Sequence, residues 1–292
     1  MNNSFMAASL PLLPSLLQKP VADWLTRTPF SARVDSATVK HWCQLSGLDS
    51  EQLMLALLPI ARGLGRAAIS HFDVGAIIEG ASGTWYMGAN LEFPGAAMGM
   101  TVHAEQCAIT HGRQCGEQRF TTLAVNYSPC GHCRQFMSEL SADLSLRILL
   151  PGRPPATLAD YLPDAFGPWS LEKQQRLLDP PTQSLATLSN DPLHQAACQA
   201  ASHSHAPYSA TLAGVALQLG DDIITGSYQE NAAYNPTLPP LQAALIMARV
   251  NGLSWQASRL VLAQRRRHSC LLDSTAQLAT ALGLPAPEHL PL

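Results

Sequence analysis

Hydrophobic residues recur with a helical period in the first part of the chain. Val39, Trp42 and Cys43 are spaced as on one face of a helix, and Gly47 supplies a stop signal after them. Prolines interrupt the segment before these residues. The pattern therefore predicts a small N-terminal segment of short helices, separated by prolines, over residues 1–48.

A further helix is expected directly afterwards. Asp49 or Ser50 can cap a helix through residues 51–58, because their side-chain oxygens accept hydrogen bonds from the first free backbone N–H groups. Pro59 has no backbone N–H, so it predicts a kink or a break there.

After residue 72 the spacing changes to short apolar runs and alternation, which are typical of strands. Strands are expected at 74–78, 84–89, 121–126 and 146–150, and helices at 104–111 and 130–140. Strands that alternate with helices predict a sheet with helices on both faces, which is an α/β fold.

An internal repeat relates the two halves of the chain. Residues 70–75 match 209–214, 88–92 match 226–230, and 101–108 match 237–244, while the shift falls only from 139 to 136 residues. In this frame Pro239 replaces His103, and Leu241 replaces Glu105. The second half is expected to fold as a copy of the first without its polar groups.

These patterns divide the chain into four parts. They are a helical segment (1–48), a first α/β domain (49–152), a proline-rich linker (153–190) and a second α/β domain (191–292). The aromatic residues Tyr161, Phe166 and Trp169 indicate that the linker packs against the protein.

Composition narrows the functional classes. Of the 292 residues, 47% are hydrophobic and 13% are charged, where about 25% charged is usual. This excludes a disordered chain and favours burial of surface in an oligomer. The net charge of −3 and one short basic run at 265–267 give no support for a nucleic-acid partner.

The cysteines and the apolar segments bear on the compartment. Seven scattered cysteines suggest a reducing environment, in which paired cysteines more often hold metal or do redox work. No apolar run reaches the ~20 residues of a membrane span, and the apolar stretch 5–17 lacks the features of a secretory signal. We expect a cytoplasmic protein without membrane contact.

Metal-binding residue types stand in two clusters, His-Ala-Glu at 103–105 and Pro-Cys-Gly-His-Cys at 129–133. Two thiols three residues apart at a helix start can face one site, where the helix dipole favours thiolates. Together, His103, Cys130 and Cys133 would supply three ligands and leave the fourth tetrahedral position to water, as in catalytic zinc sites.

Glu105 would then be a general acid/base beside the metal and not a ligand. From the residues alone, two alternatives stay open. The cysteine pair could do redox work, or Cys107 could complete a closed structural zinc site, in which Glu105 has no role. His132 is expected beside the ligands and not among them.

These residues match the H-x-E…P-C-x-x-C signature of zinc deaminases. With the segments 88–92, 161–168 and 226–231, the chain resembles the two-domain, homodimeric cytidine deaminases of bacteria over nearly its whole length. The resemblance implies a three-layer α/β/α cytidine-deaminase-like fold in two tandem copies, the first catalytic and the second silent, in a homodimer.

The resemblance also implies the chemistry. One Zn²⁺ per chain would be held by His103, Cys130 and Cys133, and Glu105 would be the proton shuttle. Zinc-bound hydroxide would attack C4 of cytidine or 2′-deoxycytidine, giving uridine or 2′-deoxyuridine and ammonia in pyrimidine salvage.

Further residues are expected at this small nucleoside substrate. Asn90 and Glu92 lie two apart on an extended segment, so they face the same side, and in the family these positions hold the ribose. The resemblance places Phe72 on the pyrimidine ring, with Leu91 and Ala104 nearby. Alternatives are hairpin-end capping for Asn90 and core packing for Phe72.

Other functions would require residues that this sequence lacks or would leave Glu105 without a role. A nucleic-acid deaminase should carry a basic channel, and a deoxycytidylate deaminase should carry a basic phosphate site in place of Glu92. A zinc-stabilised binding module would leave Glu105 idle. The silent half is expected to be a structural partner, with residues 232–235 closing the active site of the other subunit.

Overall fold

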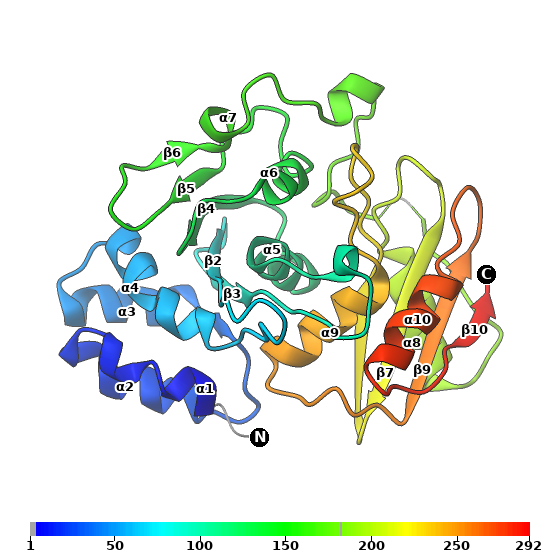
Figure 1. Cartoon of the computed structure of the whole chain (residues 1–292), viewed down its shortest axis with the longest axis horizontal. Coiled ribbons are helices and arrows are strands. Elements are labelled where there is room, and N and C mark those ends of the chain that lie inside the picture. Colours follow the sequence, from blue (N-terminus) through cyan, green and yellow to red (C-terminus); the bar gives the residue numbers. More distant parts are fainter. Residues whose placement is uncertain (1–3, 182) are drawn as a thin grey trace.

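The computed structural model describes residues 4–181 and 183–292, which build two sheets with helices around them (Figure 1). The first sheet has the strand order β1-β3-β2-β4-β5-β6. Its strands are β1 (Arg33–Val34), β2 (Gly75–Gly80), β3 (Trp85–Ala89), β4 (Phe120–Val125), β5 (Arg147–Leu149) and β6 (Ala156–Thr157). β2 runs antiparallel to β3 and β4, and β4 runs parallel to β5. The four predicted strands are confirmed, with small shifts at their ends.

Helices cover both faces of this sheet. They are α4 (Ser50–Arg62), α5 (Ala104–Gln114) and α6 (Gly131–Met137). The register of β2 and β3 places Gly75 and Gly88 on opposite faces. A Cβ on Gly75 would lie 2.4 Å from Arg62 N in α4, and one on Gly88 would lie 2.2 Å from Ala108 N in α5. α4 and α5 therefore form the two outer layers, and their close approach requires glycine.

The second half repeats this architecture. Its strand order is β10-β9-β7-β8, with β7 antiparallel to β8 and β9, and β10 parallel to β9. The elements are β7 (Leu212–Leu219), β8 (Asp222–Ser227), β9 (Arg259–Arg265), β10 (Glu288–Pro291), α8 (Pro192–Ser202), α9 (Pro240–Val250) and α10 (Leu272–Ala281). Gly226 repeats the role of Gly88, because its Cβ would lie 2.2 Å from Ala244 N in α9. The expected tandem α/β copies are confirmed.

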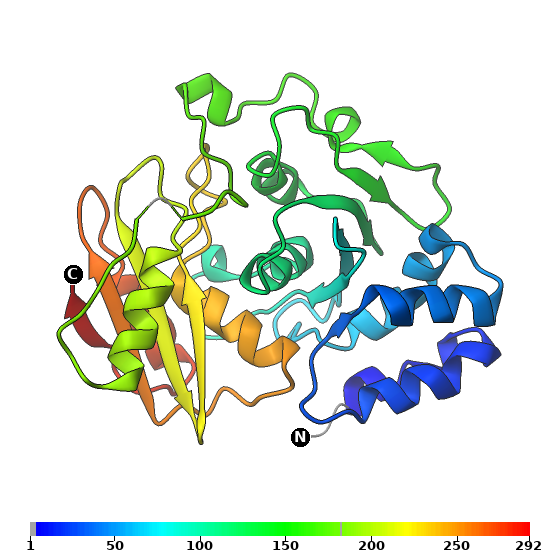
Figure 2. The same cartoon turned by 180° about the vertical axis from the view of Figure 1, so that it is seen from behind.

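Short helices precede the first copy and pack beside α4 (Figure 2). They are α1 (Ser4–Ala7), the 3₁₀ turn η1 (Leu10–Leu12), α2 (Ser15–Leu25) and α3 (Ser36–Ser46). Gly47 ends α3 with a left-handed φ of 71°, as the stop signal predicted. No helix in the described ranges is long and apolar enough to cross a membrane.

Of the kink or break predicted at Pro59, the break is wrong. α4 begins at a capping box formed by Asp49 and Gln52, and it continues through Pro59 for three more residues. Leu58 and Ile60 on either side of the proline are buried. Packing of this last turn outweighs the one backbone hydrogen bond that proline cannot make.

The helix predicted at 130–140 is shorter than expected. α6 ends at Met137, and Glu139 N and Leu140 N then donate to Phe136 O and Met137 O in tighter turns. The chain leaves the helix because Glu139 turns toward the second copy.

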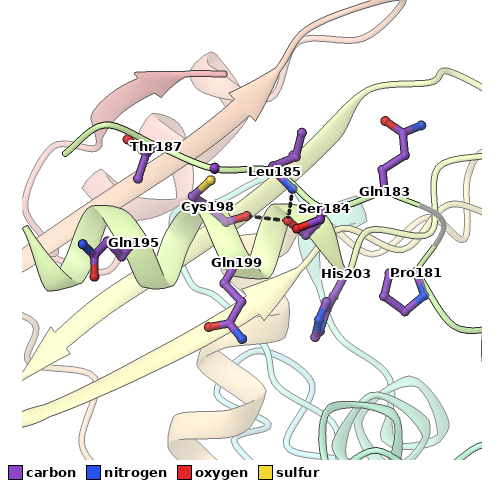
Figure 3. A pocket seen from close by; sticks show the side chains of 11 residues that line it. Pro181, Gln183, Ser184, Leu185, Thr187, Gln195, Cys198, Gln199 and His203 are labelled. Atoms are coloured by element: carbon purple, nitrogen blue, oxygen red, sulfur yellow. Dashed lines mark hydrogen bonds between the residues drawn. The ribbon is translucent and has the colours of Figure 1, made fainter. Parts of the chain in front are cut away.

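The linker packs against the protein, as its aromatic residues predicted. It supplies β6, a turn of helix α7 (Leu158–Tyr161) and the 3₁₀ turn η3 (Pro168–Leu171). Arg134 of α6 stacks on Tyr161 at 5.3 Å. A cavity of about 660 Å³ lies between linker residues 183–187 and α8, where Leu185 N donates to Ser202 Oγ at 2.8 Å (Figure 3). None of the residues at 103–105 and 129–133 lines this cavity.

The two copies meet along α5 and α9. Arg249 of α9 donates to Leu64 O of the first copy at 2.7 Å, and Arg113 of α5 donates to His203 O of the second. Donors and acceptors occupy matching positions of the repeat. The contact therefore has approximate two-fold symmetry, and it fixes α5 between the two sheets.

Candidate metal centre

Three metal-binding side chains meet where two helices begin. His103 is the N-cap residue of α5, Cys130 is the N-cap residue of α6, and Cys133 lies in the first turn of α6. His103 Nδ1 lies 3.4 Å from Cys130 Sγ and 3.3 Å from Cys133 Sγ, and the two sulfurs are 3.6 Å apart. Among the described residues, no other three such side chains lie close enough to share a metal ion.

These distances fit zinc. Tetrahedral bonds of about 2.3 Å to sulfur and about 2.0–2.1 Å to nitrogen separate two sulfurs by ~3.8 Å, and sulfur from nitrogen by ~3.6 Å. The three observed separations differ from these by a few tenths of an ångström. Cys107 lies outside the group, and burial raises the pKa of its thiol to about 12. The closed four-ligand site, which needs Cys107, does not fit this structure.

Electrostatics at the site favours anionic sulfur. Hydrogen bonding with Cys133 and with His103 lowers the pKa of Cys130 to about 3. The bond to Cys130 and burial raise the pKa of Cys133. Without a metal ion, the Cys130 thiolate is therefore favoured and Cys133 keeps its proton; a bound cation would stabilise both thiolates.

Glu105 points into the same site from the first turn of α5. Its side chain is only 4% exposed, and its Oε2 accepts a hydrogen bond from Cys133 Sγ at 3.2 Å. Burial raises the pKa of this carboxyl group. The carboxylate lies beside the three candidate ligands, which is the position that a proton-transferring group requires.

Asn90 and Glu92 hold the loop that precedes β2. Asn90 Nδ2 donates to Phe72 O at 3.0 Å. Glu92 accepts four hydrogen bonds, from Ile69 N and Ser70 N on one oxygen, and from Ser70 Oγ and Asn90 Nδ2 on the other. Burial raises the pKa of Glu92, but these hydrogen bonds outweigh it and the net pKa is lowered. Glu92 is therefore ionised at neutral pH.

The second copy repeats this set of bonds. Glu230 accepts from Tyr208 N at 2.9 Å, from Ser209 N at 3.1 Å and from Ser209 Oγ. This copy has Pro239 where the first has His103. The hydrogen-bonded carboxylate thus belongs to the shared fold, whether or not a metal site is present.

Comparison with known proteins agrees with the site. Two family models, each described as a cytidine and deoxycytidylate deaminase zinc-binding region, match residues 49–145 and 158–277. The chain belongs to this deaminase family. It is accordingly a zinc-dependent hydrolase, and the fold and the zinc cofactor expected from the resemblance are confirmed.

Two curated cytidine deaminases match over most of the chain, and a solved structure matches over part of it. The cytidine deaminase of Cronobacter sakazakii is 49% identical over 274 residues, covering 93% of each chain. That of Salmonella arizonae is 50% identical over 270 residues, covering 91% of this chain and 92% of its own. The crystal structure of the Burkholderia pseudomallei cytidine deaminase is 28% identical over 39% of this chain and 97% of its own, with a TM-score of 0.36.

The residues expected at the deaminase substrate differ in exposure. Phe72 is 48% exposed, so the core-packing alternative is wrong. Leu91 and Ala104 are buried, and both backbone polar groups of Leu91 are hydrogen-bonded to Val102. Asn90 does cap backbone groups, since its Oδ1 also accepts from Val74 N at 2.9 Å.

Tyr127 lies beside Phe72, and the sequence pattern did not predict this neighbour. Its ring lies 4.4 Å from that of Phe72 and is equally exposed. Its position three residues before Cys130 is the sequence signal that could have identified it. His132 lies beside the ligands, as expected, with its ring stacked on that of His103 at 4.8 Å.

Proposed function

We propose that this chain hydrolyses cytidine and 2′-deoxycytidine to uridine and 2′-deoxyuridine with release of ammonia, as a step of pyrimidine salvage in the cytoplasm. The observation that carries the proposal is the buried Glu105 carboxylate, 3.2 Å from Cys133 Sγ and next to an incomplete set of metal ligands. Hydrolysis needs an open metal position and a group that moves protons. A zinc-stabilised binding module needs neither.

We assign the zinc ligands as His103, Cys130 and Cys133. When bound, zinc lowers the pKa of a coordinated water and so supplies a nucleophile at neutral pH. Two thiolates offset the charge of the cation, so a separate carboxylate has to move the protons.

Glu105 is that carboxylate. It takes the proton of the attacking water and delivers it to N3 of the pyrimidine, which makes C4 more electrophilic. It then takes the remaining proton from the new C4 hydroxyl group and delivers it to the amino group, which leaves as ammonia as the C4–N bond breaks and the C4 carbonyl forms. Its fixed place in the first turn of α5, shielded from bulk water, suits repeated proton transfer within one site.

The nucleoside is assigned to the residues around this centre. Asn90 and Glu92 face the ribose, Phe72 faces the pyrimidine ring, and Leu91 and Ala104 lie nearby. A carboxylate has about four acceptor positions, and Glu92 uses all of them within the chain. A ribose hydroxyl would therefore replace one of these donors. The negative charge of Glu92 disfavours a 5′-phosphate.

The second copy is assigned a structural role in a homodimer. The proposed division keeps residues 49–152 as the catalytic domain and 191–292 as the silent one. Exposed aromatic side chains, Phe166 and Tyr234 among them, and the low content of charged residues support association of two chains. In its own chain the segment 232–235 lies beside α6, and its reach into the partner's site stays a proposal.

The proposed function is tested by measuring ammonia release from cytidine, 2′-deoxycytidine, CMP and a cytosine-containing oligonucleotide side by side. We expect rapid turnover of the two nucleosides only. Preferential turnover of CMP or of the oligonucleotide would contradict the proposed substrate class. A zinc-loaded protein that turned over none of the four would contradict the proposed reaction.

A further inference from the structure

Glu139 is a fully buried carboxylate that the proposed reaction does not use. It follows shortly after α6, whose first turn carries Cys130 and Cys133. Its relative exposure is 0%. Removing a carboxylate from water costs several kcal/mol unless other groups satisfy it, so the structure around Glu139 must supply strong hydrogen bonds.

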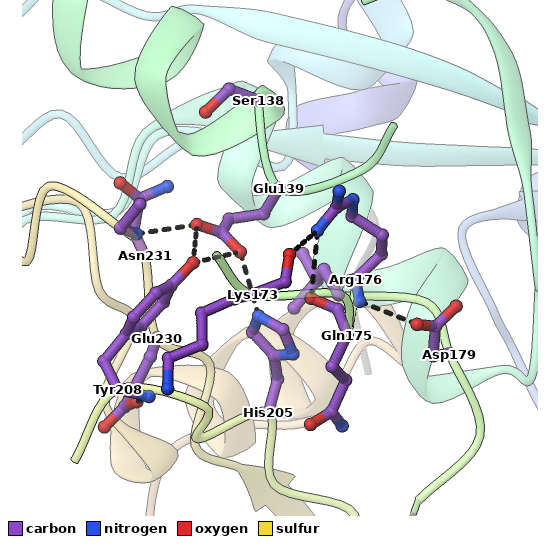
Figure 4. Close-up of polar contacts among 12 residues, drawn as sticks. Ser138, Glu139, Lys173, Gln175, Arg176, Asp179, His205, Tyr208, Glu230 and Asn231 are labelled. Carbon is purple, nitrogen blue, oxygen red and sulfur yellow. Dashed lines mark hydrogen bonds and ion pairs between the residues drawn. The ribbon is translucent and has the colours of Figure 1, made fainter. Parts of the chain in front are cut away.

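Those hydrogen bonds come from the second copy (Figure 4). Tyr208 Oη donates to Oε1 of Glu139 at 2.8 Å, His205 Nε2 donates to Oε2 at 3.0 Å, and Ala232 N donates to Oε1 at 2.6 Å. An ionised carboxylate can only accept, so the ring proton of His205 is assigned to Nε2. The carboxylate thus joins the end of α6 to two separate loops of the silent half.

The donors are particular to the second copy. Equivalent bridges in the two copies, Arg66 with Leu91 and His205 with Gln229, show that His205 occupies the position of Arg66. By the same shift, Tyr208 occupies the position of Ile69. Arg66 instead stacks on Trp255 at 4.6 Å, and Ile69 is 41% exposed. The shared fold therefore does not require a histidine and a tyrosine here. The silent half has these two residues at the place where they contact Glu139.

The position of α6 depends on such contacts. The helix has seven residues, about 10 Å, and a helix this short is not stable by itself. The second copy holds it at one more point, where Asn231 Nδ2 donates to Gln135 O at 2.8 Å. On its other side Arg134 donates to Tyr161 O of the linker at 2.9 Å.

We propose that Glu139 is a positioning residue for the zinc site. The silent copy holds the end of α6 through this carboxylate, and so it sets the place of Cys130 and Cys133 relative to His103. The inference rests on the zinc ligands assigned above. In this proposal the second copy contributes, within its own chain, to retention of the metal ion that the first copy binds.

Tyr208→Phe is the sharpest test, because it removes one hydroxyl donor to Glu139 and leaves the packing carbons in place. In the full-length, zinc-loaded protein we expect zinc release to a chelating dye to become about tenfold faster, since groups that support metal ligands contribute roughly 10–100-fold to metal affinity. The thiolate-to-metal absorption of the cobalt-substituted protein should shift as well. Glu139→Gln should accelerate zinc release more than Tyr208→Phe does. If Glu139→Gln does not fold, the result for Tyr208→Phe is sufficient for the test.

Tyr86→Phe is the matched control. Tyr86 of β3 donates to Glu117 at 3.2 Å, a similar bond without a link to α6. Its zinc release should stay within twofold of wild type. The inference would be overturned if Tyr208→Phe lost thermal stability but released zinc at the wild-type rate, or if both variants behaved alike. Tight zinc binding by Cys130→Ala would instead contradict the ligand assignment, so the two failures are distinguishable.

Discussion

Replacing Glu92 with glutamine separates the structural role of this residue from its proposed role at the substrate. The amide keeps one oxygen for Ile69 N and Ser70 N, but it turns an NH₂ group toward Asn90 Nδ2, which is itself a donor. One hydrogen bond to a charged group contributes about 1.5–3 kcal/mol. We expect the free energy of unfolding to fall by about 2 kcal/mol, an effect on the fold alone.

The effect on substrate choice has a different origin. If the 5′-phosphate of CMP were held ~7 Å from the Glu92 carboxylate, the repulsion would be about 2 kcal/mol at an effective dielectric constant of ~20, which corresponds to roughly 30-fold in affinity. Glu92→Gln should therefore reduce the preference for cytidine over CMP by about that factor. It should also raise KM for cytidine about tenfold, through the lost contact to the ribose.

The assay is ammonia release over a range of cytidine and CMP concentrations, with urea unfolding of the same samples. Glu230→Gln is the comparator, because Glu230 accepts the corresponding bonds from Tyr208 and Ser209. It should lose similar stability and keep the substrate preference. If Glu92→Gln lost stability but kept the preference for cytidine, Glu92 would only hold the loop, and the ribose assignment would be refuted.

Three further predictions concern the centre and its supporting helix. Glu105→Gln should keep zinc and lower kcat about 10²–10⁴-fold, because it removes the proton shuttle; near-normal kcat would refute that role. Cys107→Ala should keep its zinc, as metal analysis can show, because this thiol lies outside the ligand group. Burial lowers the pKa of His111 to about 4. In the unfolded chain this histidine binds a proton below pH ~6.5, whereas in the folded chain it does so only below pH ~4. Stability is thus complete above this window and is lost as the pH falls through it. Between pH 7 and 5 the wild type should lose about 2 kcal/mol more than His111→Leu, and equal losses in urea unfolding would contradict the prediction.

The sequence predicted the central elements of the first copy because each carries its own local signal. β2 and β3 are short apolar runs joined by a glycine-containing turn. In α5 the apolar residues return to a helical spacing. The edge strands β1, β6 and β10 escaped prediction, because strands of two to four residues are too short to show a periodicity. The proline in α4 was misjudged because only packing shows that its last turn is buried.

The candidate metal ligands were predictable from spacing and residue type, since His103, Cys130 and Cys133 lie at helix starts. The surroundings of Glu139 were not. Its donors are 66 to 93 residues away along the chain, and no local pattern brings them to it. The same holds for Glu92, whose spacing predicted a polar group at the site but not that the chain itself uses all its acceptor positions.

We propose that one of the two duplicated halves carries a zinc-dependent nucleoside deaminase and that the other carries none. Reconstitution tests it most directly: metal-free protein is titrated with zinc, and ammonia release from cytidine is measured at each step. We expect activity to rise in proportion to bound zinc and to stop rising at one zinc per chain. Activity that needed two zinc ions per chain, or that did not depend on zinc, would contradict it.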